Sequence, residues 1–133
     1  MKIKLLLLVL LFSNSAFSNY KFETVLDDLE DAWSFVFIDE DKILFTEMSG
    51  DLKIASISKK TINKVENTPL VQYSGQGGLS DVALDPNFES NNTVYLSYSA
   101  RNENRKTTLF LLSAELKGNA LINSKVIFQA KAP

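Results

Sequence analysis

Short segments of alternating apolar and polar residues recur along most of the 133-residue chain, separated by residues that favour turns. Such alternation is typical of half-buried strands, and Gly, Asp, Asn or Ser stands between most of the segments. The segments expected to be strands are residues 33–38, 42–47, 52–58, 61–65, 78–84, 93–99, 107–115 and 121–129, with a further short one at 20–26. The pattern therefore predicts an all-β chain.

Apart from segment 20–26, the predicted strands divide into two groups of four. The first group opens at Trp33 and the second at Leu79. This spacing lies within the period of about 40–50 residues of proteins that repeat a four-stranded sheet. Few residues are shared between the groups, so the repeat is one of pattern. We expect two four-stranded antiparallel sheets.

A glycine-rich turn, Ser-Gly-Gln-Gly-Gly at residues 74–78, leads into the second group. Its glycines permit backbone conformations and close approaches that a Cβ atom would forbid. Gln76 is therefore presented on a backbone that bulkier neighbours would not crowd. An ordinary hairpin loop between strands would account for the same residues. After the next strand, Asp85-Pro86-Asn87 is expected to turn the chain again.

The glycine-rich turn and the two predicted strands after it resemble the soluble aldose sugar dehydrogenases of the glucose/sorbosone dehydrogenase family. The matching residues are Gly75-Gln76-Gly77-Gly78-Leu79, residues 81–88 and residues 94–98. The resemblance implies a six-bladed β-propeller that uses pyrroloquinoline quinone (PQQ). This chain would supply its first two blades, four-stranded antiparallel sheets, and leave the ring incomplete. The resemblance also implies that Gln76 lines the PQQ pocket.

The resemblance is looser before the turn. Trp33, Thr46, Glu47 and Gly50 match the family pattern, whereas Met48 stands where members often have arginine. Residues 39–41 replace the family's Pro-Asp-Gly turn, and alanine precedes the tryptophan in place of proline. These departures weaken inferences about the substrate more than inferences about the fold.

The family's catalytic base is a histidine in a His-Gly-Gly-Arg motif, and this chain contains no histidine. Residues 126–133 resemble the approach to that motif. The resemblance thus implies an N-terminal fragment that lacks the catalytic histidine and is inactive alone, with the calcium ligands that orient PQQ also downstream. The implied activity of the whole protein is oxidation of the C1 hydroxyl of aldose sugars, with an external electron acceptor.

The first 18 residues have the pattern of a secretory signal. Lys2 and Lys4 precede an apolar run at 5–12, and small residues precede a cleavage site after Ser18. The run is shorter than the about 20 apolar residues of a membrane-spanning helix, although an uncleaved anchor is the alternative. We expect a signal peptide at 1–18, a propeller part at 19–133, a periplasmic or secreted location, and no membrane span after cleavage.

Composition and the acidic residues limit other functions. A net charge of −2 without a basic block argues against nucleic acid as a partner, and the lack of cysteine excludes a disulfide framework. Glu47, Asp81 and Asp85 could supply acid–base chemistry, but turn formation explains Asp85 and a salt-linked surface position explains Glu47. The acidic residues 27–31 are expected to form a solvated turn. No catalytic residue and no metal ligand is therefore expected in this chain.

Six aromatic side chains are expected to pack in the core and between sheets. They are Trp33, Phe35, Phe37, Phe45, Tyr95 and Tyr98. The alternative to the dehydrogenase function is a non-catalytic secreted β-domain that binds a sugar or a partner protein, for instance by pairing an exposed strand edge.

Overall fold

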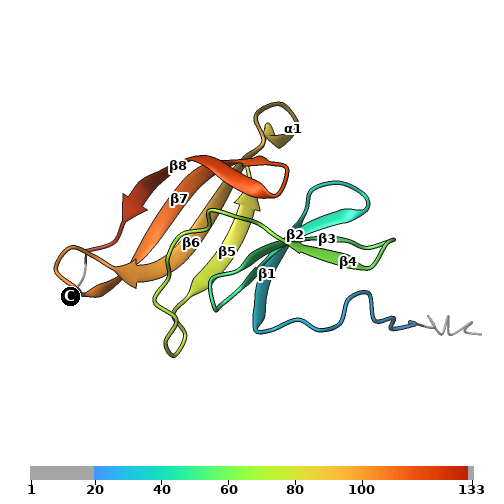
Figure 1. Cartoon of the computed structure of the whole chain (residues 1–133), viewed down its shortest axis with the longest axis horizontal. Helices are drawn as coiled ribbons and strands as arrows, with labels where there is room; N and C mark the ends of the chain where they lie inside the picture. Colours follow the sequence, from blue (N-terminus) through green and yellow to red (C-terminus); the bar gives the residue numbers. More distant parts are fainter. Residues whose placement is uncertain (1–19, 132–133) are drawn as a thin grey trace, which may run out of the picture.

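The structure, a computed structural model, describes residues 20–131 and consists mainly of two four-stranded antiparallel sheets (Figure 1). The first sheet has the order β1 (Ala32–Phe37), β2 (Lys42–Glu47), β3 (Leu52–Ser56) and β4 (Thr61–Lys64). The second has the order β5 (Leu79–Leu84), β6 (Thr93–Arg101), β7 (Thr107–Lys117) and β8 (Ala120–Gln129). The predicted signal peptide at 1–18 lies outside the described residues.

All eight strands of the two predicted groups are present, so the all-β prediction of two four-stranded antiparallel sheets is confirmed. The one helical element among residues 20–131, α1 (Phe88–Asn91), is a single turn that the sequence patterns did not predict. It follows the predicted turn at 85–87, where an Asp85 carboxylate oxygen accepts hydrogen bonds from the Asn87 backbone N–H and the Asn91 side chain, both at 2.9 Å. These contacts close the chain into a helical turn before β6 begins.

The predicted strand at 20–26 is wrong for the described structure. Residues 20–29 have no regular structure, and Tyr20 and Phe22 are 84% and 97% exposed. A strand needs a neighbour with which to pair its backbone groups. Within residues 20–131, no strand pairs with this segment, so alternation alone does not make it a strand.

The hydrophobic core lies between the two sheets. In the first sheet, Val36 pairs with Leu44 and Leu44 with Ile54, so these side chains share the face that meets the second sheet. A polar contact also joins the sheets, because the Thr46 hydroxyl donates to the Ser80 carbonyl at 2.5 Å. The buried residues of this core are Leu44, Leu52, Val65, Leu79, Val82, Val94, Leu96, Tyr98, Leu112, Ala114, Leu116 and Leu121.

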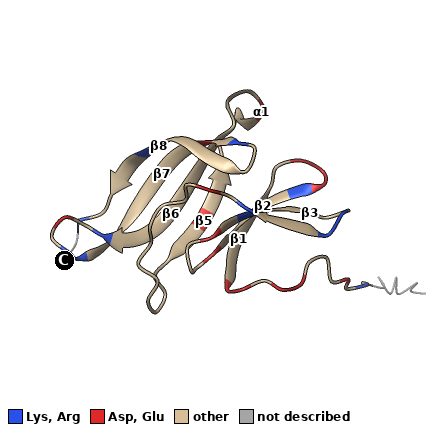
Figure 2. Cartoon of the chain, in the orientation of Figure 1, with Lys and Arg blue, Asp and Glu red and all other residues tan. Residues whose placement is uncertain are grey.

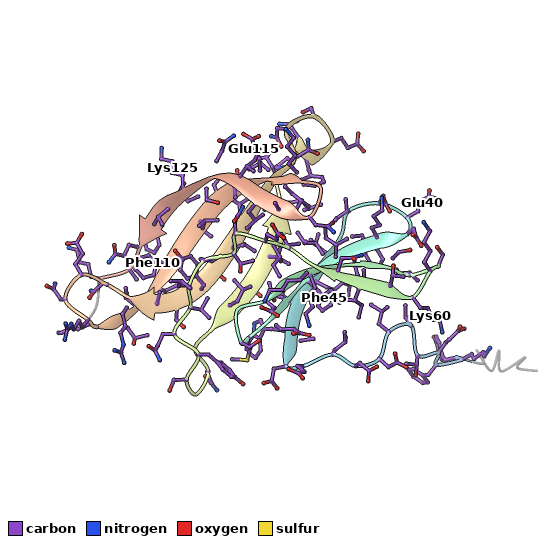
Figure 3. The ribbon with its side chains drawn as sticks, viewed as in Figure 1. Glu40, Phe45, Lys60, Phe110, Glu115 and Lys125 are labelled. Carbon is purple, nitrogen blue, oxygen red and sulfur yellow. The ribbon has the colours of Figure 1, made fainter. Side chains whose placement is uncertain are left out.

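Two of the predicted core aromatics are buried, namely Phe45 and Tyr98. The Tyr98 ring stacks on Phe110 with centroids 5.4 Å apart. Figure 3 shows Phe45 within the first sheet and Phe110 within the second. Tyr95 is half-buried and donates its hydroxyl to Asp85 at 2.7 Å.

The prediction is wrong for the three aromatics of β1 in the described structure. Trp33, Phe35 and Phe37 are 56%, 63% and 56% exposed. They alternate with Val36, which faces the second sheet, so they point to the opposite face of the first sheet. No other sheet of the described chain covers that face.

The pairing registers show which residues of β1 and β5, the first strands of the two sheets, hold equivalent positions. The equivalence differs by one residue from the predicted one, which placed Trp33 opposite Leu79 in the repeat. Ala32 pairs with Glu47 before an irregularity in β1, and Leu79 pairs with Tyr98 before an irregularity in β5. Leu79 therefore corresponds to Ala32, and not to Trp33 as the repeat predicted.

Candidate functional site

The glycine-rich turn forms a small closed loop just before β5. Gly77 N–H donates to the Ser74 carbonyl at 2.9 Å, and Ser74 N–H donates to the Gly77 carbonyl at 3.3 Å. Gly75 and Gln76 are left at the tip, where Gly75 has a φ of +60°. A left-handed residue at a two-residue tip favours glycine, because a Cβ atom there meets its own backbone.

Gly78 brings the loop against the first sheet. Its φ is +153°, and a Cβ atom built on it would lie 2.0 Å from the carbonyl oxygen of Met48. Leu79 N–H donates to the same carbonyl at 3.1 Å. The turn between β2 and β3 thus touches the start of β5 directly, which only a residue without a side chain allows.

One side chain of the second sheet also holds the loop. The Ser99 hydroxyl, on β6, accepts a hydrogen bond from Gly78 N–H at 2.7 Å and donates to the Gln72 carbonyl at 3.3 Å. The loop is therefore fastened at both of its ends, and its tip extends away from these contacts.

The predicted cofactor residue, Gln76, lies at this tip and is exposed. Among residues 20–131 its side chain has no hydrogen-bond partner, so its amide is free to donate and to accept. That it contacts a cofactor stays a prediction.

A residue that the sequence patterns missed supports the same loop from the other side. The Tyr73 hydroxyl donates to the Asp31 carboxylate at 2.5 Å, and this hydrogen bond raises the pKa of Tyr73 above its ordinary value. The Asp31 carbonyl accepts from Met48 N–H at 3.1 Å. Figure 2 shows acidic residues along the segment before β1. Residues 27–31 are exposed, as predicted for a solvated turn, but the contacts of Asp31 with Tyr73 and Met48, which lie far away in the sequence, were not predicted.

Glu47 is salt-linked as predicted, but it is not at the surface. The residue is 1% exposed, and its carboxylate lies 2.7 Å from the Lys53 ammonium nitrogen on the neighbouring strand. It also accepts a hydrogen bond from the Glu30 backbone N–H at 3.0 Å. The segment before β1 covers this ion pair, which explains its burial. Both carboxylate oxygens are used, so Glu47 has a structural role.

The other two acidic candidates do not join Glu47 in one site. Asp85 follows the end of β5 that is remote from the glycine-rich turn, and its carboxylate is occupied by Asn87, Asn91 and Tyr95. The backbone N–H of Asn87, with the two side chains, lowers the pKa of Asp85 below its ordinary value. The Asp85 carboxylate is therefore not placed for proton transfer at the Gln76 tip. Asp81 is exposed on β5.

A cleft of about 430 Å³ opens at the α1 end of the two sheets, and Gln76 is not among the residues that line it. Asp41, on its wall, accepts hydrogen bonds from the Ser56 hydroxyl at 2.6 Å and from Ser58 N–H at 2.7 Å. These bonds, first that from Ser56, lower the pKa of Asp41 to about 2. The carboxylate therefore holds two turns together and stays ionised near neutral pH.

Residues 20–131 hold no group of three or more acidic side chains placed to bind a metal ion. Within the same residues, no helix has the length and apolar character needed to cross a bilayer.

Comparison with known proteins places the chain in a family. The family model described as Glucose / Sorbosone dehydrogenase matches residues 29–133. An uncharacterised protein of Synechocystis is 33% identical over 113 residues, which are 79% of this chain and 27% of that protein. The aldose sugar dehydrogenase YliI of Escherichia coli is 35% identical over 78 residues, 58% of this chain and 21% of that protein.

Solved structures agree. The apo form of the soluble aldose sugar dehydrogenase of Escherichia coli superposes with a TM-score of 0.74 at 26% identity, over 80% of this chain and 32% of that one. The PQQ-bound aldose sugar dehydrogenase of Streptomyces coelicolor has the same fold, with a TM-score of 0.68 at 19% identity over 81% of this chain and 33% of that one. The chain spans about a fifth to a third of the length of these relatives. The chain belongs to the glucose/sorbosone dehydrogenase family.

Proposed function

We propose that this chain is the N-terminal part of an exported, PQQ-dependent dehydrogenase that oxidises the C1 hydroxyl of aldose sugars. Family membership supports the proposal, together with relatives described as aldose sugar dehydrogenases, one of them PQQ-bound. The observation that carries it is the anchored glycine-rich turn, which presents the unpartnered Gln76 side chain at its tip within the described part of the chain.

The two sheets are proposed to be the first two blades of a six-bladed β-propeller. By register, Phe35 and Phe37 of β1 hold the positions that Val82 and Leu84 hold in β5. Val82 and Leu84 pack against the first sheet. The two phenylalanines would pack in the same way against a preceding sheet. An apolar depression of about 340 Å³ that they help to line supports such packing.

The residues present fit the quinone in one respect, namely that Gln76 offers a free amide. An amide can donate to a quinone oxygen and accept from a neighbouring donor. When bound, PQQ supplies the hydride acceptor for the sugar carbon. Gln76 would hold the edge of the cofactor, while the loop contacts of Gly78 and Ser99 keep the tip in place.

The remaining machinery is proposed to lie downstream. The chain contains no histidine, so the base that removes the sugar hydroxyl proton would come from a later blade, as would the calcium ligands. The 133 residues alone would then be inactive. The pattern at residues 1–18 and a periplasmic or secreted location are part of the same proposal, as is an external electron acceptor.

The test is PQQ binding, with calcium, by the product of the complete reading frame, followed by dye-linked oxidation of aldoses. Gln76→Ala is expected to weaken PQQ binding about tenfold, the effect of one lost hydrogen bond to a charged or strongly polar partner. Gln129→Ala, the same change at an exposed position of β8, is the matched control and should leave binding unchanged. If the complete product does not bind PQQ, the dehydrogenase proposal fails and a non-catalytic β-domain replaces it.

A further inference from the structure

A single residue of β6 holds both ends of the glycine-rich loop. Its backbone carbonyl accepts from Gln72 N–H at 2.7 Å, and its backbone N–H donates to the Gly78 carbonyl at 2.9 Å. Its hydroxyl bonds the remaining backbone group of the same two residues: it accepts from Gly78 N–H at 2.7 Å and donates to the Gln72 carbonyl at 3.3 Å. This residue is Ser99, and it satisfies backbone groups of the segment that enters the loop, at Gln72, and of the segment that leaves it, at Gly78.

The position of the Ser99 hydroxyl requires glycine at residue 77 of the loop. A Cβ atom at Gly77 would lie 2.7 Å from the Ser99 Oγ atom, closer than ordinary contact allows. The hydroxyl therefore rests against the bare Cα of Gly77, immediately beside Gln76 in the chain. A change in the position of the hydroxyl would be transmitted directly to the tip.

We propose that Ser99 is a positioning residue, whose hydroxyl sets the place of Gln76 toward PQQ. The inference rests on the proposed function, because it needs Gln76 to contact the cofactor. Without the hydroxyl, Gly78 N–H, a buried donor, loses its partner, and the Gln72 carbonyl loses one of its contacts. A buried donor without a partner is costly, so the loop is expected to open more often.

Ser97 provides a matched control on the same strand and the same face. Its hydroxyl accepts from the Asp81 backbone N–H at 3.0 Å, a contact between β6 and β5 and not with the loop. Ser97→Ala and Ser99→Ala thus remove the same group from neighbouring positions of β6. A role in stability alone would make the two variants alike.

The experiment compares both variants in the product of the complete reading frame by hydrogen exchange and by PQQ titration. In Ser99→Ala, exchange in the peptide that covers residues 72–79 should rise about tenfold, and the PQQ dissociation constant should rise about tenfold. In Ser97→Ala neither quantity should change, even where the two variants lower the unfolding midpoint to the same extent. That combination supports the inference.

Other outcomes overturn it and separate it from the proposed function. Unchanged exchange in Ser99→Ala, or an equal loss of PQQ affinity in both serine variants, refutes the positioning role. If Gln76→Ala weakens PQQ binding and Ser99→Ala does not, the positioning role fails while the proposed function stands. If neither variant weakens binding, the assignment of Gln76 fails and the inference fails with it.

Discussion

Replacing Gly78 by alanine should destabilise the protein far more than the same change at Gly75. The new Cβ atom would lie 2.0 Å from the Met48 carbonyl oxygen and 2.9 Å from its carbon, both backbone atoms that cannot turn aside. The chain would have to separate there and lose the hydrogen bond from Leu79 N–H to Met48. We expect about 3–5 kcal/mol, from about 1–3 for an unfavourable φ, about 0.5–1.5 for the hydrogen bond, and the packing lost as the sheets move.

Gly75 is the matched control. Its φ is also positive, but a Cβ atom there would meet nothing within 4 Å. Gly75→Ala should therefore cost only about 1 kcal/mol, the cost of the left-handed conformation. The measurement is urea denaturation of both variants in the product of the complete reading frame, followed by circular dichroism. If Gly78→Ala costs no more than Gly75→Ala, the close approach between the two sheets is not present in solution.

Three further predictions concern charges and exposed faces. Asp41→Asn should destabilise the protein at pH 7, and the difference in unfolding free energy between the two proteins should shrink as the pH falls from about 4 toward 2. The reason is that the pKa of Asp41 is lower in the folded state, about 2, than in the unfolded state, so its stabilisation is complete above the unfolded pKa and is lost as the pH falls through the folded pKa. Urea denaturation at a series of pH values measures this. Glu47→Gln should cost about 2–3 kcal/mol in urea denaturation, because it leaves the mostly buried Lys53 ammonium unpaired, and a second change of Lys53 to Met should recover most of that loss. Purified alone, the described part of the chain should self-associate through the exposed face of β1 that carries Phe35 and Phe37. The double variant Phe35→Ser, Phe37→Ser should show less association in light scattering. An unsubstituted chain that is monomeric and unfolds cooperatively would contradict the reasoning.

Local pattern predicted most of the fold because strands and turns leave short-range signals. The strand at 42–47 was predicted with its observed bounds, because turn-forming residues at 39–41 and 49–51 flank it on both sides. Alternation did not show which segments find a partner strand, and segment 20–26 has none in the described chain. It also did not show whether both faces of β1 would be covered, so Trp33 was expected to be buried and is exposed.

The candidate site was predicted only at its centre. A glycine-rich turn with one glutamine is visible in the sequence, and the structure places Gln76 at the tip. Its supports come from residues far away in the chain, Ser99 on β6, Asp31 before β1 and Met48 after β2. No local pattern marks them, because their contacts with the loop form only when the folded chain brings these distant residues together.

The most direct test of the central claim is hydrogen exchange of the complete product with and without PQQ. The claim is that the loop at residues 74–78 holds Gln76 against the cofactor. Bound PQQ should then slow exchange in the peptide that covers residues 72–79, while the peptide of α1, at the remote end of β5, keeps its rate. PQQ that binds without slowing exchange in residues 72–79 would contradict the claim.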